Sequence, residues 1–247
     1  MKKLTGLLVI IISLSISSQS QTWLQIQKVS GGKDSIKLSD ISRIYFTTLV
    51  TGGIPCPGTP TVTYGAQTYN TVLIGNQCWL KENLNVGTKI SANQNAINNF
   101  QVEKYCYNNN SAYCDTFGAL YQWNEAMDYS TTAGAQGICP SGWHIPTKVE
   151  FETLCATVNN NSNALKSIGE GTGSGAGTNT TGFSALIAGY HYPSGGFVHL
   201  DYNAYFWTST KWSSESSYYL FMYATNSFPY ILNNDNVNGQ SVRCLKN

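Results

Sequence analysis

The sequence predicts an α+β fold in which the C-terminal half of the chain forms most of an antiparallel sheet. Tyrosine, phenylalanine and tryptophan make up 13% of the 247 residues, and only 11% of the residues are charged, so the chain can bury a substantial core. Two segments between residues 116 and 158 show helical spacing of apolar residues, and short alternating segments separated by polar turns follow them. Helical segments followed by a run of strands are typical of an α+β fold.

Residues 1–20 have the features of a secretory signal peptide. Lys2 and Lys3 precede a mainly apolar stretch from Leu4 to Ile16, and residues 18–20 (Ser-Gln-Ser) provide small side chains at a cleavage site. This stretch is shorter than the ~20 residues that a membrane-spanning helix needs; a buried N-terminal helix is the alternative. We therefore expect export and no membrane-spanning segment in the mature chain. The net charge of +1 also disfavours nucleic acid as a partner.

The composition divides the exported chain into three parts. Residues 21–48 contain two short alternating segments, at 22–29 and 42–48, which predict a β-ribbon. Residues 49–60 are rich in glycine and proline, which is typical of a linker. Residues 61–247 contain every asparagine of the chain and are expected to form a single domain.

The first helix of this domain is predicted at residues 116–127. Its apolar residues recur at three- and four-residue intervals, and Asp115 or Thr116 can provide the N-terminal cap. In this helix Glu125 and Asp128 are expected on a solvated face.

The second helix is predicted at residues 147–158. Thr147 and Glu150 have the spacing of a capping box and come directly after Pro146. Its apolar residues form one stripe that we expect to be buried: Phe151, Leu154, Cys155 and Val158.

Strand patterns account for much of the remaining domain. They occur at residues 67–75, 76–80, 183–192, 196–201, 204–210, 218–224, 229–233 and 241–245. In the strand at 204–210, alternation places Tyr205 and Trp207 on one face and Phe206 on the other, with Trp207 expected in the core. The glycine-rich residues 169–182 are expected to form a surface loop.

The seven cysteines of an exported chain are expected to form disulfides. Spacing and neighbouring residues favour three pairs: Cys106–Cys114, Cys139–Cys244 and Cys56–Cys78. Six cysteines permit fifteen connectivities, so other pairings remain open. The seventh, Cys155, lies on the apolar stripe of a predicted helix and is expected to be a buried free thiol.

Six ordered segments resemble the Fibrobacter succinogenes major paralogous domain, a family of secreted or surface proteins of Bacteroidota and Fibrobacterota. They are TVLIGNQCWLKENLN, YCYNNNSAYCDTFGALYQWNEAM, CPSGWHIPTKVEFETL, TGFSALIAGY, FWTST and SVRC. Residues 142–152 and 241–244 also resemble motifs of the C-type-lectin-like superfamily, which includes formylglycine-generating enzymes. This resemblance implies an antiparallel sheet with two flanking helices and long irregular loops. The ribbon at 21–48 resembles a segment that often follows signal peptides in Bacteroidota proteins.

The resemblance does not extend to the catalytic residues of formylglycine-generating enzymes. Those enzymes use two closely placed cysteines that bind copper, whereas here Cys244 matches only a structural cysteine and residues 218–243 contain none. The three histidines lack the spacing of a metal-binding motif. His144 is expected to be packed, and His191 and His199, which could face each other across a hairpin, would need further metal ligands. We therefore expect no enzyme, no metal and no cofactor.

A binding role fits the composition better. Aromatic rings that stack on sugars, beside amides that bind hydroxyl groups, suggest a shallow glycan site. The candidate residues are Trp212, Tyr190, Tyr192, Asn233, Asn234 and Asp235. The run at 233–236 supplies oxygen atoms for calcium, but a turn is the preferred interpretation. The expected function is adhesion to glycan, polysaccharide or another cell-surface partner by a secreted or surface protein. The alternatives are a structural protein–protein module or, less favoured, an enzyme of the formylglycine-generating type.

Overall fold

The computed structural model describes four parts of the chain: Ile12–Ser15, Trp23–Gln27, Lys33–Lys37 and residues 53–247. The chain divides into two compact units, Met1–Leu49 and Val50–Asn247. Within the described parts, no helix is both long and apolar enough to cross a membrane.

The first unit contains a three-stranded antiparallel sheet. Its strands are β1 (Ile12–Ser15), β2 (Trp23–Gln27) and β3 (Lys33–Lys37), in the order β1-β2-β3. β2 confirms the strand expected at 22–29, whereas the strand expected at 42–48 lies outside the described residues. β3 forms in the stretch that was expected only to connect those two strands, and β1 falls within the predicted signal peptide.

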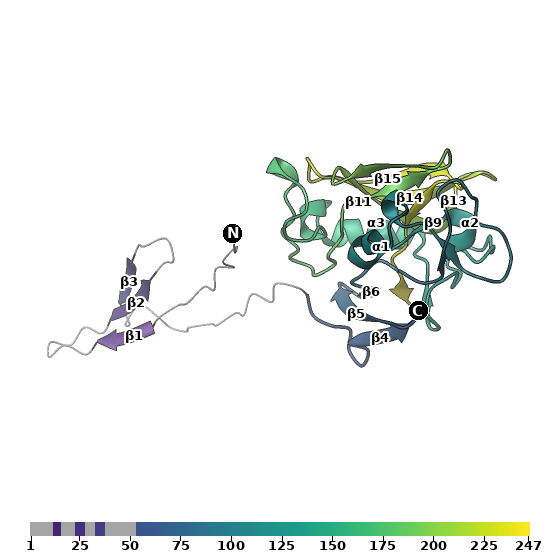
Figure 1. The fold of residues 1–247 in the computed structure, drawn as a ribbon. Helices are drawn as coiled ribbons and strands as arrows, with labels where there is room; N and C mark the ends of the chain where they lie inside the picture. The colour runs from purple at the N-terminus through teal and green to yellow at the C-terminus, as the bar shows by residue number, and fades with distance from the viewer. Residues whose placement is uncertain (1–11, 16–22, 28–32, 38–52) are drawn as a thin grey trace. The chain divides into compact units, whose positions relative to one another are not determined.

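The second unit is built on two sheets (Figure 1). The five-stranded sheet has the order β10 (Trp143–His144), β17 (Leu245–Lys246), β6 (Gln77–Leu80), β5 (Gln67–Ile74) and β4 (Thr61–Tyr64). The other has the order β12 (Gly196–Leu200), β11 (Ala188–Tyr192), β16 (Gly239–Ser241), β13 (Asn203–Lys211), β14 (Ser216–Tyr223) and β15 (Pro229–Asp235), with β9 (Leu120–Gln122) paired to β16. A short parallel pair, β7 (Thr88–Lys89) with β8 (Glu103–Lys104), completes the strands of this unit.

The fold is mainly β, with a few short helices, and it matches the α+β prediction only loosely. A single antiparallel sheet was expected, but there are two sheets, and Phe206 of β13 pairs with Ser241 of β16 in parallel. In Figure 1, β11 and β13–β15 lie along the upper side of this unit, and β4–β6 lie along the lower side.

The prediction of one continuous helix at residues 116–127 is wrong. The structure has α1 (Ser111–Phe117), then β9, then the short helix α2 (Trp123–Ala126). α1 is capped by the side chain of Asn110, not by Asp115 or Thr116. It ends because Gly118 adopts a φ of +79° and lies against Asn83, where an added Cβ would come within 2.4 Å of the Asn83 Cβ.

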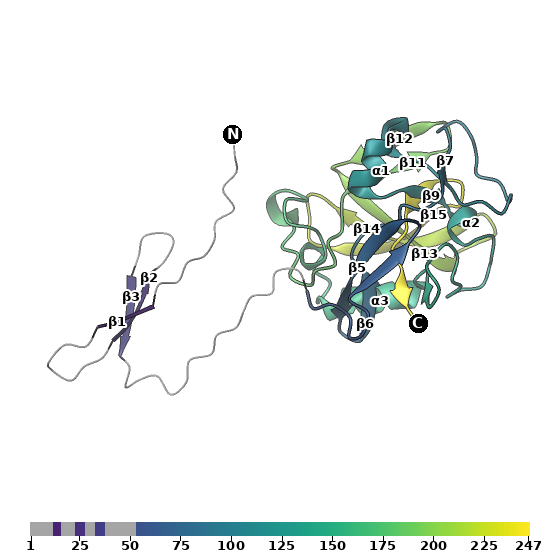
Figure 2. The ribbon, with the colours of Figure 1, turned by 60° about the horizontal axis from the view of Figure 1, so that its bottom comes forward.

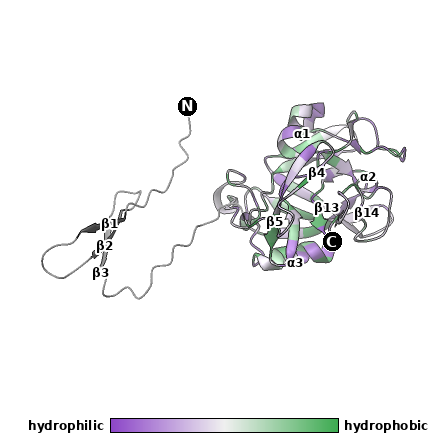
Figure 3. Ribbon diagram, turned by 90° about the horizontal axis from the view of Figure 1, so that it is seen from below, coloured by the Kyte–Doolittle hydropathy of each residue, from purple (hydrophilic) through white to green (hydrophobic). Residues whose placement is uncertain are grey.

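The helix predicted at residues 147–158 is confirmed as α3 (Lys148–Thr157). Thr147 and Glu150 form the expected capping box. The predicted apolar stripe is buried, and Figure 3 shows that α3 contains both hydrophobic and hydrophilic residues. In Figure 2, α3 lies beside β6, near the C-terminus.

Two core clusters lie against opposite faces of β13 and β14. Tyr205 and Trp207 belong to one cluster and Phe206 to the other, as alternation predicts. Trp207 is fully buried, as expected. The cluster that contains Phe206 also contains the buried stripe of α3, so α3 covers that face of the sheet.

The strand expected at residues 241–245 is divided between the two sheets. β16 ends at Ser241 and β17 begins at Leu245, so residues 242–244 cross from one sheet to the other. Arg243, in this crossing, is fully buried and donates hydrogen bonds to the side-chain oxygen of Asn83 and to the carbonyl oxygens of Leu80 and Phe183. Burial lowers the pKa of Arg243 to about 9. These bonds satisfy the buried guanidinium and hold the two sheets together.

All three expected disulfides are confirmed: Cys56–Cys78, Cys106–Cys114 and Cys139–Cys244. Cys155 is a buried free cysteine, as expected, and burial raises its pKa to about 12. The bond from Cys56 and a bridge from Ile54 to Leu73 attach the end of the expected linker, 49–60, to β5 and β6.

The expected surface loop at residues 169–182 is held by backbone hydrogen bonds. It contains the 3-10 turn η4 (Gly173–Gly175) and follows another, η3 (Ser162–Ala164). The backbone N–H of Thr172 donates to the carbonyl oxygen of Ala224, at 2.8 Å. Nearby, the buried Lys166 donates to the carbonyl oxygens of Tyr223 and Asn226, and burial lowers the Lys166 pKa to about 8.

Candidate functional site

The predicted binding residues do not form one site, because they lie on different faces of the seven-stranded sheet. Tyr190 is half-buried, and its ring lies 4.9 Å from that of Tyr205, on the face that carries Trp207. Trp212 contacts Tyr218, at 5.5 Å between the ring centroids. Tyr218 points to the other face, since it alternates with Leu220, which belongs to the core cluster under α3.

The side of Tyr190 carries a continuous set of aromatic rings, which we call the aromatic face. It consists of Tyr190, Tyr205, Tyr219, Phe221, Tyr223 and Tyr230. Neighbouring rings lie within contact distance, from 4.4 Å between Phe221 and Tyr223 to 6.3 Å between Phe221 and Tyr230. The strand register explains this, because Tyr205 pairs with Phe221, and Phe221 pairs with Tyr230, across three adjacent strands.

The aromatic face runs from the core to solvent. Tyr205 and Phe221 are each only 5% exposed, whereas Tyr223 and Tyr230 are each 39% exposed. Leu232 lies two residues beyond Tyr230 on the same face and is 41% exposed, and Tyr192, two residues beyond Tyr190, is 50% exposed. The inner rings thus fix the positions of the outer rings, which remain available to a partner.

The hydroxyl groups of Tyr190, Tyr205 and Tyr219, the inner tyrosines of the aromatic face, stay protonated near neutral pH. Burial raises the pKa of Tyr205, Tyr219 and Tyr190, that of Tyr219 to about 12. The Tyr205 hydroxyl lies 2.7 Å from Nδ1 of His199 and accepts a hydrogen bond from the amide of Asn203. The rings therefore present an uncharged surface with phenolic O–H groups at its edge.

The opposite side of the sheet presents a smaller patch around Trp212. The Trp212 ring is 60% exposed, and the ammonium group of Lys148 lies 5.4 Å from the centre of the Tyr218 ring. Asn233 and Asp235 are exposed on this side, since Asn233 pairs with Tyr218 and Asp235 with Ser216.

Residues 233–235 end strand β15, and the turn that was expected at 233–236 lies at residues 236–237. The side-chain oxygen of Asn234 accepts hydrogen bonds from the amide of Asn238 and from the backbone of Asp235, and that of Asn236 accepts from Ser217. These two amide oxygens are already used as acceptors within the protein. A hollow of about 390 Å³ lies beside the turn. In the described ranges, no three His, Cys, Asp or Glu side chains are grouped as metal ligands.

The three histidines occupy separate environments. His144 is packed, as expected, between Asn247 and the carboxylate of Glu150. His191 and His199 do not face each other, because His191 pairs with Phe197, stacks on Tyr105 at 3.8 Å and bonds to a backbone carbonyl. The three histidines are therefore not brought together in one site.

The candidates predicted from the sequence did not include Tyr223 and Tyr230, the most solvent-exposed rings of the aromatic face. Ile231 separates Tyr230 from Leu232 in the strand at 229–233, so this stretch is a continuous apolar run whose pattern does not reveal which face is exposed. The structure places this strand, β15, at the edge of its sheet, with Tyr230 and Leu232 on one side. Edge position, which leaves such a side partly uncovered, is not visible in the sequence.

Comparison with known proteins gives one significant match. No curated protein and no solved structure matches the chain. A family model described as the Fibrobacter succinogenes major domain matches residues 72–246. The match includes all the residues of the aromatic face and the cysteines of two of the disulfides.

Proposed function

The chain belongs to the Fibrobacter succinogenes major domain family, and we propose that it is a secreted or cell-surface binding protein without enzymatic activity. Its aromatic face adheres to glycan or polysaccharide. The single observation that supports this most is the set of rings that runs from buried Tyr205 and Phe221 to exposed Tyr223 and Tyr230.

Stacking on sugars suits this surface. The C–H groups of a sugar ring are apolar and pack against an aromatic ring, while the phenolic hydroxyl can bond to the sugar hydroxyl groups. The buried rings hold Tyr223 and Tyr230 in place, so these side chains lose less conformational entropy when a ligand binds. Because the rings are uncharged, neutral polysaccharides are the favoured ligands.

An extracellular location agrees with this function. Three disulfides are typical of proteins that fold in an oxidising compartment. The signal peptide at residues 1–20 remains a prediction from the sequence.

The C-type-lectin-like fold is also a proposal. Two features support it: the helix α3, whose N-terminal cap Thr147 directly follows Pro146, and the Cys139–Cys244 bond, which links the segment before that helix to the residue before the C-terminal strand β17. Both features correspond to the motifs on which the resemblance was based.

Binding to neutral soluble polysaccharides tests the proposed function. Affinity electrophoresis in gels that contain xylan, glucomannan or β-glucan is expected to retard the wild-type protein in at least one of them. The double variant Tyr223→Ala, Tyr230→Ala is expected to lose about tenfold in affinity, since each aromatic contact contributes roughly 0.5–1.5 kcal/mol.

Trp212→Ala is the matched control, because it removes an exposed aromatic ring from the opposite side of the sheet. Retardation that is lost in Trp212→Ala and retained in the tyrosine variant would move the site to the Trp212 patch. The absence of retardation in every polysaccharide would contradict the glycan proposal.

The second candidate function is a protein–protein module, favoured by the open edge of β15. This seven-residue strand pairs only with β14 in the described part of the chain, and its exposed Tyr230 and Leu232 border that edge. Co-purification of a cell-envelope protein with the wild type, but not with a variant carrying Ile231→Pro in β15, would favour this candidate over glycan binding.

A further inference from the structure

A pocket of about 210 Å³ lies beside α1, away from the rings of the aromatic face. Its wall combines α1 and the end of that helix with the segment after β6 and with Ser167, Ser184 and Leu186. The pocket shares no residue with the aromatic face. Its volume is below the ~300–1,000 Å³ of pockets for drug-sized ligands, so it suits one small ring rather than a chain.

The base of this pocket is rigid. Asn83 is 4% exposed, donates to the carbonyl oxygen of Phe117 and accepts hydrogen bonds from the buried Arg243. Gly118 lies against Asn83 so closely that an added Cβ would clash with it. A preformed base loses little entropy when a ligand binds.

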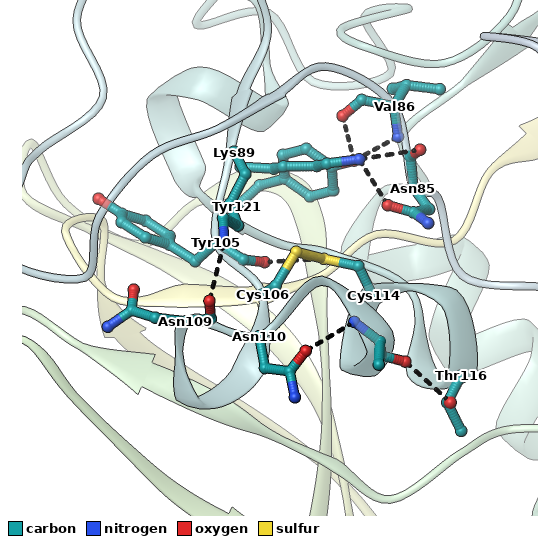
Figure 4. The surroundings of a disulfide bond; sticks show 12 residues. Asn85, Val86, Lys89, Tyr105, Cys106, Asn109, Asn110, Cys114, Thr116 and Tyr121 are labelled. Carbon is teal, nitrogen blue, oxygen red and sulfur yellow. Dashed lines mark hydrogen bonds between the residues drawn. A yellow bond between two sulfur atoms is a disulfide. The ribbon is translucent and has the colours of Figure 1, made fainter.

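A disulfide fixes the helical wall of the pocket. The Cys106–Cys114 bond joins α1 to the 3-10 turn η2 (Tyr107–Asn109), which precedes it. Figure 4 shows this bond together with Asn85 and Thr116, two further residues of the wall. Tyr121 fixes the residue next to Asn85, because its hydroxyl accepts a hydrogen bond from the backbone N–H of Val86 and donates one to the Val86 carbonyl oxygen.

Asn85 supplies a donor at the pocket that the protein itself does not use. The residue is 7% exposed and lines the pocket, and its side-chain oxygen accepts a hydrogen bond from Lys104 at 2.6 Å. That bond directs the oxygen toward Lys104, and among the described residues the amide nitrogen of Asn85 has no acceptor. Because Asn85 lines the pocket, this N–H group can donate to an acceptor of a ligand.

The rest of the wall offers groups that bind hydroxyls and an apolar surface. The ammonium group of Lys81 and the carboxylate of Asp115 both line the pocket and make no hydrogen bond to the described residues. Phe117 and Leu186 are half-buried and provide the apolar surface. Charges of both signs are present, so an anion or a cation would meet a like charge, whereas an uncharged polyol can use donors and acceptors together.

We propose that this pocket binds one neutral sugar ring, such as the terminal unit of a glycan. The sugar packs one face on Phe117 and Leu186. Its hydroxyl groups accept from the Asn85 amide and from Lys81 and donate to Asp115. This site is separate from the aromatic face, and the proposal does not depend on polysaccharide binding there.

Titration of the full chain with neutral methyl glycosides tests the proposal. The probes are the methyl glycosides of glucose, galactose, mannose, xylose and N-acetylglucosamine, followed by two-dimensional NMR of the backbone amides. At least one of them is expected to shift the amides of Asn85 and Asp115 with a Kd on the order of 1 mM, as suits a single small ring. The expectation is the same whether or not the protein is retained by polysaccharide gels.

Two variants of Asp115 and one control variant locate the site. Asp115→Ala changes an exposed helix residue, leaves the fold intact and is expected to weaken binding about three- to tenfold, the value of one hydrogen bond. Asp115→Asn keeps an acceptor and is expected to recover most of the affinity. Asp201→Ala, which removes an exposed carboxylate outside the pocket, is the control and is expected to bind like the wild type.

Three results would overturn the proposal. They are the absence of a shift with all five glycosides, shifts confined to residues outside the pocket, and tighter binding of inorganic phosphate or glucuronate than of any neutral glycoside. The last result would assign the pocket to an anion.

Discussion

The three disulfides close loops of very different length, and this difference predicts how strongly each one stabilises the fold. The bonded cysteines are 8, 22 and 105 residues apart in sequence. Replacing both cysteines of one bond by alanine frees the unfolded chain from that loop. The three loops do not overlap, so each replacement is expected to act independently.

The chain-entropy relation sets the magnitudes. It gives about 2.5 kcal/mol for Cys106–Cys114, about 3.4 kcal/mol for Cys56–Cys78 and about 4.8 kcal/mol for Cys139–Cys244. The most informative comparison is between the first and the last of these pairs. All four of those cysteines are at least 97% buried, so the cost of removing the sulfur atoms is similar and the free energies of unfolding should differ by about 2.3 kcal/mol.

Urea unfolding of the full chain, followed by tryptophan fluorescence, measures this difference. Each double variant is made in a Cys155→Ala background, because a free thiol in the unfolded state can exchange with the remaining bonds. The reasoning is refuted if the Cys106–Cys114 variant loses as much stability as the Cys139–Cys244 variant, or more.

Four further perturbations test other parts of the structure. The hydrogen bond to Glu150 raises the pKa of His144, so the stabilisation from this contact is complete below the pKa of the unfolded state and is lost as pH rises through the pKa of the folded state. The urea midpoint of His144→Gln is therefore expected to fall less between neutral and alkaline pH than that of the wild type. Parallel curves for the two proteins would contradict this. Glu150, whose pKa is lowered, contributes above its unfolded pKa and loses this contribution as acid is added, so Glu150→Gln is expected to flatten the acid side of the same curve. Gly118→Ala is expected to cost about 1–3 kcal/mol in urea unfolding, because φ is positive and Asn83 blocks a Cβ, and a change below 0.5 kcal/mol would rule out that strain. Trp212→Ala is expected to shift stability by only about 0.5 kcal/mol, since the ring is 60% exposed, and a large loss would place it in the core.

Local signals in the sequence predicted local structure well. The capping box at Thr147 and Glu150 and the apolar stripe that follows it were sufficient to locate α3, because both features act within a few residues. Spacing and neighbouring residues also led to the three disulfides, including Cys139–Cys244, which links distant parts of the chain.

The prediction failed where contacts distant in sequence decide the conformation. Residues 116–127 have helical spacing, but Gly118 must fit against Asn83, and residues 120–122 pair with β16 more than a hundred residues later. Tertiary pairing overrode the local propensity there.

The buried Glu125 shows the same limitation. It was expected on a solvated helix face, yet it is 3% exposed, accepts hydrogen bonds from the backbone of Glu103 and from the hydroxyl of Tyr129, and has a pKa that burial raises. Nothing in the local pattern reveals partners supplied by the chain on either side.

The candidate site was only partly predictable for a related reason. Tyr190 was identified from composition, but the other rings of the aromatic face come from β13, β14 and β15, and the register of those strands decides which side each ring occupies. The same register separates Trp212 from Tyr190. A list of aromatic residues cannot show this division, because a one-residue change in pairing would reverse it.

Tyrosine footprinting tests most directly whether the aromatic face is the binding surface. The protein is nitrated with tetranitromethane, with and without the polysaccharide that retards it in gels, and each tyrosine is quantified by mass spectrometry. Polysaccharide is expected to protect Tyr223 and Tyr230 and to leave Tyr64, a partly exposed tyrosine of β4 in the other sheet, equally reactive. Unchanged reactivity of Tyr223 and Tyr230 in the bound protein would contradict the account.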